Sequence, residues 1–404
     1  MRLFHAVWLY TLLLLAALGG PAFADPPVVI KDVKLSGTGS RTQITLTSTE
    51  RIPVNAFVLD EPRRVVLDLP EVNFELGGNA GKTGKGLVSA WRFGHFAAGQ
   101  SRIVFDIRSP AVISEVKIIS TVEGAPHRVV IEVIKATQDK FLDQVQKRAA
   151  KADEAAPSVE QMQDVAGQAS WPLVVIDPGH GGIDGGAHAS GTFQEKNFTL
   201  GFAKILKEEL QKRNIARVTL TRDKDIFIPL KGRREIAQKN KAALFISIHA
   251  DSFGNRSASP SGATVYTLSE KASDQEAATF AERENRADEV AGVANAPESN
   301  EVADILFDLM QRETKSFSQI FSHQLTGELK GNIKLNQNPR RSAGFVVLRS
   351  PEVPAVLLEM GYLSNDKDVE QMQDEVWQRQ AAQAVVKAVG AFLEQSQSTG
   401  ATDK

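Results

Sequence analysis

The sequence contains no cysteine among its 404 residues. Disulfide bonds are therefore excluded, and an exported form of this chain must be held together by its own core. Any metal ion must be bound through nitrogen and oxygen atoms, because thiolate ligands are absent. The side chains to consider as metal ligands are histidine, glutamate and aspartate.

The sequence also lacks an excess of charge of either sign. Its formal net charge is -2, so bulk electrostatics does not favour nucleic acid or an anionic membrane as the main partner. Apolar residues make up 42% of the chain and charged residues 24%, which is typical of globular proteins. A chain of this length is expected to form two folded domains.

The N-terminus carries an apolar run. Residues 3–18 are interrupted only by His5 and Thr11, and the helix-breaking residues 19–21 and the small-x-small sequence of residues 22–24 follow. This order predicts a signal peptide over residues 1–24, cleaved after Ala24, which implies export to the periplasm. The alternative is a membrane anchor, since the run is near the lower length limit for crossing a bilayer. Cleavage would leave no stable membrane span.

Residues 28–135 are expected to form an all-β sandwich. Short alternating segments such as 44–47, 65–69 and 103–107 are separated by turn formers. The segment also repeats itself weakly: Arg64–Leu69 resembles Arg128–Val133, and residues 43–46 resemble residues 102–105. Two similar halves stacked on each other would explain these echoes.

Residues 136–169 are rich in Lys, Glu, Gln, Asp and Ala and predict a solvated linker with partial helical character, which would let the domains move independently. A second domain over 171–395, followed by a tail at 396–404, alternates continuous apolar strands with helical segments. That pattern predicts an α/β domain whose mixed sheet is mostly buried and flanked by helices.

A charged, helical segment from Ser269 to Leu329 interrupts this second domain. It is rich in Glu, Ala, Arg and Asp, and the core fold is not expected to need it. We therefore interpret residues 269–329 as an insertion.

Two of the seven histidines stand where a metal ligand is expected. His180 follows the buried run 173–176, and His249 follows the buried run 244–248. Each imidazole would emerge at the carboxyl end of a strand, facing a solvent-accessible rim. Two such histidines and one carboxylate match the three-ligand pattern of a catalytic zinc site.

The third ligand is expected to be Glu195, just before the helical segment 197–210. From that position it could project back toward the strand ends, while Asp184 could orient a ligand from outside the metal's own ligand set. On spacing alone, Glu195 could equally be a charge that favours the start of the helix.

A metal-dependent hydrolase also needs a base that is not a ligand. Glu359 ends the apolar strand 355–358, where a purely structural charge would be unfavourable. The alternative interpretation is a buried ion pair between Glu359 and an arginine such as Arg233.

These residues also carry a family resemblance. The blocks Val175–Gly182, Glu195–Lys196, Ser247–Asp251 and Pro354–Asn365 are similar, in the same order, to the signature blocks of the zinc-dependent N-acetylmuramoyl-L-alanine amidases. Residues 28–135 resemble, less specifically, the AMIN-like β-sandwich targeting module of the cell-division amidases of Gram-negative bacteria.

The resemblance implies one Zn²⁺ per catalytic domain, with His180, Glu195 and His249 as ligands and Glu359 as the catalytic glutamate. It further implies hydrolysis of the amide bond between N-acetylmuramic acid and L-alanine in peptidoglycan. That reaction would serve septal wall splitting and separation of the daughter cells.

In the cell-division amidases, a helical insertion covers the zinc until a LytM-like activator displaces it. By this resemblance, residues 269–329 are expected to be inhibitory, with Glu284 as the blocking carboxylate and Glu282 or Glu289 as alternatives. An apolar helix face over Ile305, Leu306, Leu309 and Met310 is expected either to pack on the core or to bind the activator.

Two other functions are compatible with the same residues. The chain could be a zinc carboxypeptidase or deacetylase acting on cell-wall fragments, or a wall-binding protein without activity. The β module has no cluster of ionisable residues resembling an active site, so we interpret it as a binding module. Its aromatic stretch Trp91–Phe96 would stack on sugar or, as we expect, fill the sandwich core.

Overall fold

The computed structural model describes residues 27–78, 80–119, 126–152, 171–189, 193–253, 260–293 and 305–400. The predicted signal peptide at 1–24 lies outside the described residues. Within these ranges, no helix has both the length and the apolar character needed to cross a membrane.

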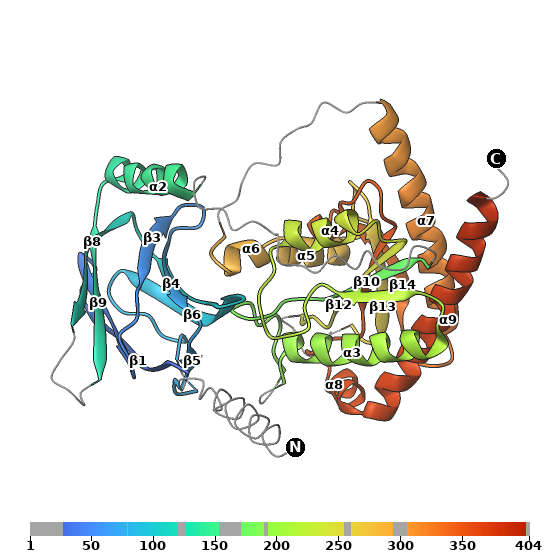
Figure 1. The fold of residues 1–404 in the computed structure, drawn as a ribbon, viewed down its shortest axis with the longest axis horizontal. Coiled ribbons are helices and arrows are strands. Elements are labelled where there is room, and N and C mark those ends of the chain that lie inside the picture. The colour runs from blue at the N-terminus through green and yellow to red at the C-terminus, as the bar shows by residue number, and fades with distance from the viewer. Residues whose placement is uncertain are drawn as a thin grey trace, which may run out of the picture.

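The first domain is a sandwich of two sheets (Figure 1). One sheet has the strand order β5-β1-β2-β9-β8 and the other β3-β4-β7-β6; all pairs are antiparallel except the short parallel pair β1–β5. The strands are β1 (Val29–Gly37), β2 (Arg41–Ser48), β3 (Asn55–Leu59), β4 (Arg64–Pro70), β5 (Asn73–Phe74), β6 (Val88–Ala97), β7 (Gln100–Ile107), β8 (Ala111–Ile119) and β9 (His127–Lys135).

The echoes found in the sequence occupy equivalent places in this sandwich. Strands β2 and β9 pair inside one sheet, and strands β7 and β4 pair in the middle of the other. Each echoed segment is buried on its inward side, since Ile44 and Ile131 meet Val65 and Ile103 in one core cluster. Each sheet therefore pairs a strand of the first half with a strand of the second, so the two halves are interleaved and not stacked as separate layers, contrary to expectation.

Helix α2 (Gln138–Ala152) begins inside the predicted linker and packs on the sandwich. Its Phe141 is fully buried in the sandwich core, and Leu142 and Val145 pack against that core. The first part of the expected linker therefore adds to the β domain. Residues 153–169 of that segment lie outside the described residues.

The second domain has a six-stranded mixed sheet of order β11-β10-β12-β15-β13-β14. Strand β13 runs antiparallel to β15, and the other pairs are parallel. Its elements are β10 (Leu173–Pro178), α3 (Glu195–Arg213), β11 (Arg217–Leu220), α4 (Leu230–Lys239), β12 (Leu244–His249), β13 (Ala263–Leu268), α5 (Gln275–Glu284), α6 (Ala287–Val290), α7 (Ile305–Leu329), β14 (Leu335–Ala343), the 3-10 helix η2 (Val346–Leu348), β15 (Ala355–Glu359), α8 (Asp366–Gln373) and α9 (Glu375–Gly400).

Both faces of this sheet are covered, which explains its continuous apolar strands. Val174 and Ile176 of β10 face the core shared with helices α3, α7 and α9. Leu173 and Val175, pointing the other way, pack with residues of α4, α5 and η2. Every residue of β10 and β12 is buried.

The helices of the predicted insertion, residues 269–329, pack in two different places. Helices α5 and α6 lie on the face of the sheet that also carries α4 (Figure 1). Helix α7 instead contributes Phe321, Leu325 and Leu329, all fully buried, to the main core. The expectation that the whole segment 269–329 is unnecessary to the core is therefore wrong for the C-terminal part of α7, whose apolar face packs against the sheet and α9.

The sandwich contacts the α/β domain through the outer face of its four-stranded sheet, and α6 lies between the two domains (Figure 1). Phe57, Val66 and Val104 from the sandwich form one buried cluster with Phe227 and Ala291. The aromatic stretch divides between two environments. Trp91 fills the sandwich core, as expected, whereas the ring of Phe96 stacks on Phe227 with 5.9 Å between centroids.

Candidate metal centre

His180 lies two residues beyond β10, in a loop rich in glycine. Its backbone adopts a φ of 60°, followed by Gly181 and Gly182, which also have positive φ. Its Nδ1 lies 2.8 Å from Oδ2 of Asp184, as the sequence suggested for an orienting carboxylate. This hydrogen bond directs Nε2 toward the ends of the neighbouring strands.

His249 is the last residue of β12, which runs parallel to β10. The loop after β10 approaches His249 closely at Gly179, where an added Cβ atom would lie 2.5 Å from Cε1 of His249. Only glycine permits this approach, so the loop after β10 brings the two imidazoles together. Their ring centroids are 5.0 Å apart.

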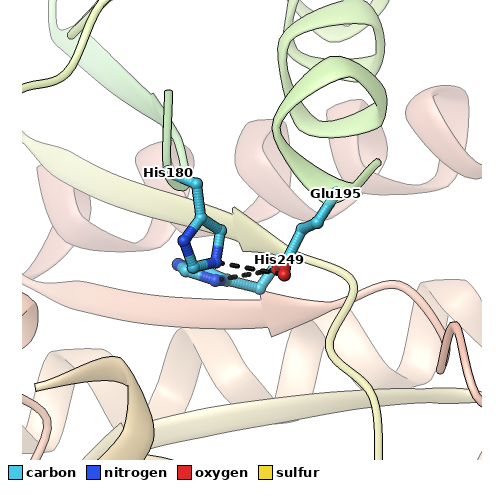
Figure 2. Close-up of side chains that lie close together, drawn as sticks. All are labelled: His180, Glu195 and His249. Atoms are coloured by element: carbon cyan, nitrogen blue, oxygen red, sulfur yellow. Dashed lines mark hydrogen bonds and ion pairs between the residues drawn. The ribbon is translucent and has the colours of Figure 1, made fainter. Parts of the chain in front are cut away.

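Glu195 is the first residue of α3 and is fully buried. Its Oε2 accepts a hydrogen bond from the backbone N–H of Ala187 at 2.8 Å, and its Oε1 accepts one from Ala250 at 2.8 Å. These donors fix the carboxylate between the two histidines (Figure 2). Glu195 can therefore begin helix α3 and lie beside the two imidazoles at the same time.

The three side chains form a group suited to a metal ion. One potential ligand atom of each lies within 4.8 Å of the others. The distances are 3.1 Å from His180 Nε2 to Glu195 Oε2 and 3.2 Å from His249 Nδ1 to Glu195 Oε1 (Figure 2). Although Glu195 Oε2 lies 3.1 Å away, the buried His180 Nε2 forms no hydrogen bond with any of the described residues. Two imidazole nitrogens and a carboxylate, all buried, fit a divalent cation.

The electrostatic environment of these side chains is also suited to a cation. Burial opposes the charged form of His180, but the carboxylates of Asp184, Glu195 and Glu284 outweigh it and raise the pKa of His180 well above its usual value. Burial likewise opposes the charge on Glu195, yet His180 and His249 hold its pKa well below the usual range. The site therefore favours positive charge at the point where the three side chains meet.

Glu359 ends β15, the strand next to β12, and is paired in register with His249. It is fully buried, and its Oε1 accepts a hydrogen bond from the backbone N–H of Asp251 at 2.6 Å. In the part of the chain that the structure describes, its Oε2 has no hydrogen-bond partner. Burial, reinforced by the charges of Glu195 and Asp251, raises the pKa of Glu359 well above its usual value. This carboxyl group can hold a proton.

The alternative partner for Glu359 is excluded, because Arg233 is engaged elsewhere. Arg233 Nη1 lies 2.9 Å from Asp177 Oδ1 and 2.8 Å from the carbonyl oxygen of Pro178. Its Nη2 donates to the carbonyl oxygen of His180 at 2.8 Å. Arg233 therefore braces the loop that presents His180.

Glu284, the last residue of α5, reaches into the same centre. Its Oε2 lies 3.1 Å from His249 Nδ1 and 3.6 Å from His180 Nε2. The two other carboxylates considered from the sequence are placed differently: Glu282 is exposed, and Glu289 pairs with Arg286 at 3.1 Å. Burial raises the pKa of Glu284, although the two histidines oppose this.

Comparisons with known proteins agree with this geometry. A family profile described as N-acetylmuramoyl-L-alanine amidase matches residues 174–391, and an AMIN domain profile matches residues 32–133. N-acetylmuramoyl-L-alanine amidase AmiC of Escherichia coli O6:H1 is 30% identical over 373 residues, which cover 89% of this chain and 88% of the relative. The chain belongs to the N-acetylmuramoyl-L-alanine amidase family.

Two further relatives and one solved structure are similar to the chain. AmiC of Neisseria meningitidis serogroup B is 31% identical over 369 residues, covering 88% of each chain. AmiA of Escherichia coli K12 is 40% identical over 222 residues, which cover 55% of this chain and 76% of AmiA. The solved catalytic domain of CwlV from Bacillus (Paenibacillus) polymyxa is 28% identical and covers 55% of this chain and 98% of that one, with a TM-score of 0.40.

Sequence reasoning left two polar residues of the amidase without a role. Asp251 follows His249 by two positions; burial, with the charges of Glu284 and Glu195, raises its pKa to about 7. Arg283 of α5 forms an ion pair with Asp251. The position of Asp251 beside His249 was a usable signal, whereas nothing near Arg283 indicated its partner.

A cavity of about 570 Å³ opens beside the candidate metal-binding group of the amidase. His180, Glu195 and Glu284 line it, and so do Arg92 and Phe93 of the sandwich. The centre is therefore reached from a space to which both domains contribute.

Proposed function

We propose that this amidase holds one zinc ion through His180, Glu195 and His249 and hydrolyses the amide bond between N-acetylmuramic acid and L-alanine in peptidoglycan. The observation that carries the proposal is the meeting of two imidazole nitrogens and one carboxylate within 4.8 Å. A zinc ion in such a site supplies Lewis acidity, which polarises a carbonyl and lowers the pKa of water.

The side chains around that centre have distinct tasks. Asp184 holds His180 in the tautomer that leaves Nε2 free, and Arg233 fixes the backbone carbonyl of His180. Glu359 takes a proton from the attacking water and gives it to the departing amine nitrogen. Its unpartnered Oε2 and raised pKa are consistent with a group that carries a proton during turnover.

We infer that the described arrangement is an inhibited form. The Glu284 carboxylate lies 3.1 Å from His249 Nδ1 and 3.6 Å from His180 Nε2, where water or substrate would need to stand. Arg283 secures the end of α5 through Asp251. Turnover would then require α5 and α6 to move away from the ligands.

The enzyme is proposed to act in the periplasm, at the division site, where it splits the septal wall and separates daughter cells. A LytM-like activator would displace the inhibitory helices. Ile305, Leu306, Leu309 and Met310, at the start of α7, are the proposed docking face, argued from their helical spacing in the sequence.

Digestion of purified sacculi with the mature, zinc-loaded protein tests the reaction. Mass spectrometry should find intact stem peptides released from the glycan strands, with release stopped by a chelator and restored by zinc. Release of single terminal amino acids or of acetate would instead assign a carboxypeptidase or deacetylase. No zinc-dependent product under any condition, including with an activator, would leave only a wall-binding protein.

A further inference from the structure

The outer face of the four-stranded sheet carries three arginines, one on each of the strands β4, β6 and β7. Arg64 and Arg102 stand on β4 and β7, on the side opposite the core residues Val65 and Ile103. Arg92 stands on β6. In an isolated sandwich this face would be open to water, because its inward neighbours already fill the core.

All three arginines donate to the carbonyl oxygens at the C-terminal end of α6. Arg64 Nη1 donates to Glu289, Arg92 Nε to Val290, and Arg102 Nη1 to Ala291 and Gly292, the last two at 3.1 and 2.9 Å. The last carbonyls of a helix have no partner within the helix. The sandwich thus supplies the hydrogen bonds that the end of α6 lacks.

Apolar contacts complete this interface. Val66 and Val104, both fully buried, lie between the arginines on the same sheet face and form a cluster with Ala291. A Cβ atom on Gly292 would lie 3.0 Å from Cγ2 of Val104 and 3.2 Å from Cγ2 of Val66. Since Gly292 also has a φ of 69°, glycine suits both its conformation and its close packing.

The segment held in this way is the one that carries Glu284. Only Asn285 and Arg286 separate the end of α5 from the start of α6. The α/β domain adds its own anchors, because Asp288 accepts from the backbone N–H of Leu230 at 2.9 Å and Asn285 donates to Gly344 at 2.9 Å. The inhibitory segment is therefore fixed from two domains.

The sandwich side of the interface is suited to release. Arg102 is paired with Asp68 and Arg92 with Asp106, whereas Arg64 donates to the backbone carbonyl oxygens of Pro62 and Glu289. Burial, together with the nearby charge of Arg92, lowers the pKa of Arg64 to about 10. Separation of the domains would return this guanidinium to water. The hydration free energy that it regains would offset part of the free energy lost with the interface contacts.

We propose that the outer face of the sheet β3-β4-β7-β6 is a latch that holds α5 and α6 over the metal centre, so that undocking of the sandwich releases Glu284. The inference rests on the proposed inhibition by Glu284 and adds the element that maintains it. Any ligand that binds the sandwich better when it is undocked must then favour the open site. The binding module is thereby coupled to catalysis.

The test compares interface variants of the full mature chain, without activator. Val104→Lys places a charge in the buried cluster, and Arg92→Gln removes one donor to α6. Val116→Lys is the matched control, since Val116 lies on edge strand β8 and is 40% exposed, and Arg41→Gln, at an exposed arginine, controls for the second variant. Circular dichroism verifies that each variant folds.

Two measurements are made on each chain: backbone hydrogen exchange over residues 275–293 and zinc-dependent release of peptide from sacculi. Both interface variants should exchange faster in this segment and raise basal activity about 5-fold or more, the lower end of typical coupling between sites. The two controls should match the parent chain. If Val104→Lys does not fold, Arg92→Gln alone decides the outcome.

Unchanged exchange and activity in the folded interface variants would overturn the latch. Glu284→Gln, measured in parallel, separates this result from a failure of the inhibition itself. If Glu284→Gln is activated while the interface variants are not, Glu284 inhibits but the sandwich does not hold it. If the interface variants are activated and Glu284→Gln is not, the latch stands and another group blocks the centre.

Discussion

Glu359 is the residue whose removal should separate chemistry from metal binding. It is buried beside His249 but lies outside the candidate metal-binding group of His180, Glu195 and His249. Glu359→Gln should lower peptide release by about 10²- to 10⁴-fold, the usual contribution of a general acid–base, while zinc content stays at one per chain. Activity and metal analysis of the same preparation measure both effects.

Glu352→Gln serves as the control for this prediction, because Glu352 is exposed and stands shortly before the same strand. It should behave like the parent chain. Near-normal activity of the Glu359→Gln protein would require another residue as the base.

Asp177 supports the loop that carries His180 through its ion pair with Arg233. Its ionisation should therefore make the free energy of unfolding depend on pH. Its carboxylate receives Arg233 at 2.9 Å, Thr221 at 2.6 Å and Ser247 at 2.7 Å. Burial opposes its charge, but Arg233 and the two hydroxyls outweigh burial and lower the pKa of Asp177. The stabilisation it provides is therefore present above the unfolded pKa of about 3.9 and is lost as the pH falls through the lower folded pKa.

Asp177→Asn should lower the free energy of unfolding at pH 7 by about 3–5 kcal/mol, because Arg233 stays buried without its counter-charge. The difference between parent and variant should begin to narrow below about pH 4, where the unfolded parent takes up the proton, and should shrink further as the pH falls through the lower folded pKa. Urea unfolding at pH 7, 5 and 3, with chelator present throughout, measures it. A difference that does not depend on pH would mean that Asp177 is not ionised in the folded protein.

At the scale of single elements, Glu284 links helix α5 to His180 and His249. Glu284→Gln keeps the size of the side chain but removes the charge that faces the two histidines. Basal peptide release should rise by about 5-fold or more. Glu282→Gln, on the exposed side of the same helix, should leave the rate unchanged.

The start of α7 is the element proposed to bind the activator. Leu309→Lys should weaken activation, measured as the activator concentration needed for half-maximal peptide release, because a charge interrupts the apolar face. Basal release and the unfolding temperature should stay near those of the parent chain. Equal activation of parent and variant would move the docking face elsewhere.

Secondary-structure elements and the convergence of His180 and His249 were predictable from the sequence where local pattern determines them. The apolar runs of β10 and β12 end directly before His180 and His249, so parallel neighbouring strands had to bring the two together. The role of α7 was not predictable in the same way. Its charged N-terminal neighbourhood suggested an insertion, while Phe321, Leu325 and Leu329 join the core through contacts with α9 and the sheet.

At the scale of the whole molecule, the contact between the domains had no signal in the sequence. Arg64, Arg92 and Arg102 fit the pattern of outward-facing strand residues, which are ordinarily solvated. Their partners are backbone carbonyls about 190 to 225 positions away, and a carbonyl has no residue type by which it could be recognised. Only the tertiary arrangement brings the open sheet face to the end of α6.

The metal should also stabilise the whole catalytic domain, because its ligands come from the loop after β10, from α3 and from β12. A ligand that binds only the folded chain stabilises it by about 2.7 kcal/mol at a free concentration of 100 times its dissociation constant. The unfolding temperature should therefore rise with free zinc and fall with chelator. Glu195→Gln should remove this dependence, whereas Glu359→Gln should retain it. Calorimetry that finds the same zinc-dependent rise in Glu195→Gln would place the bound metal at a different site.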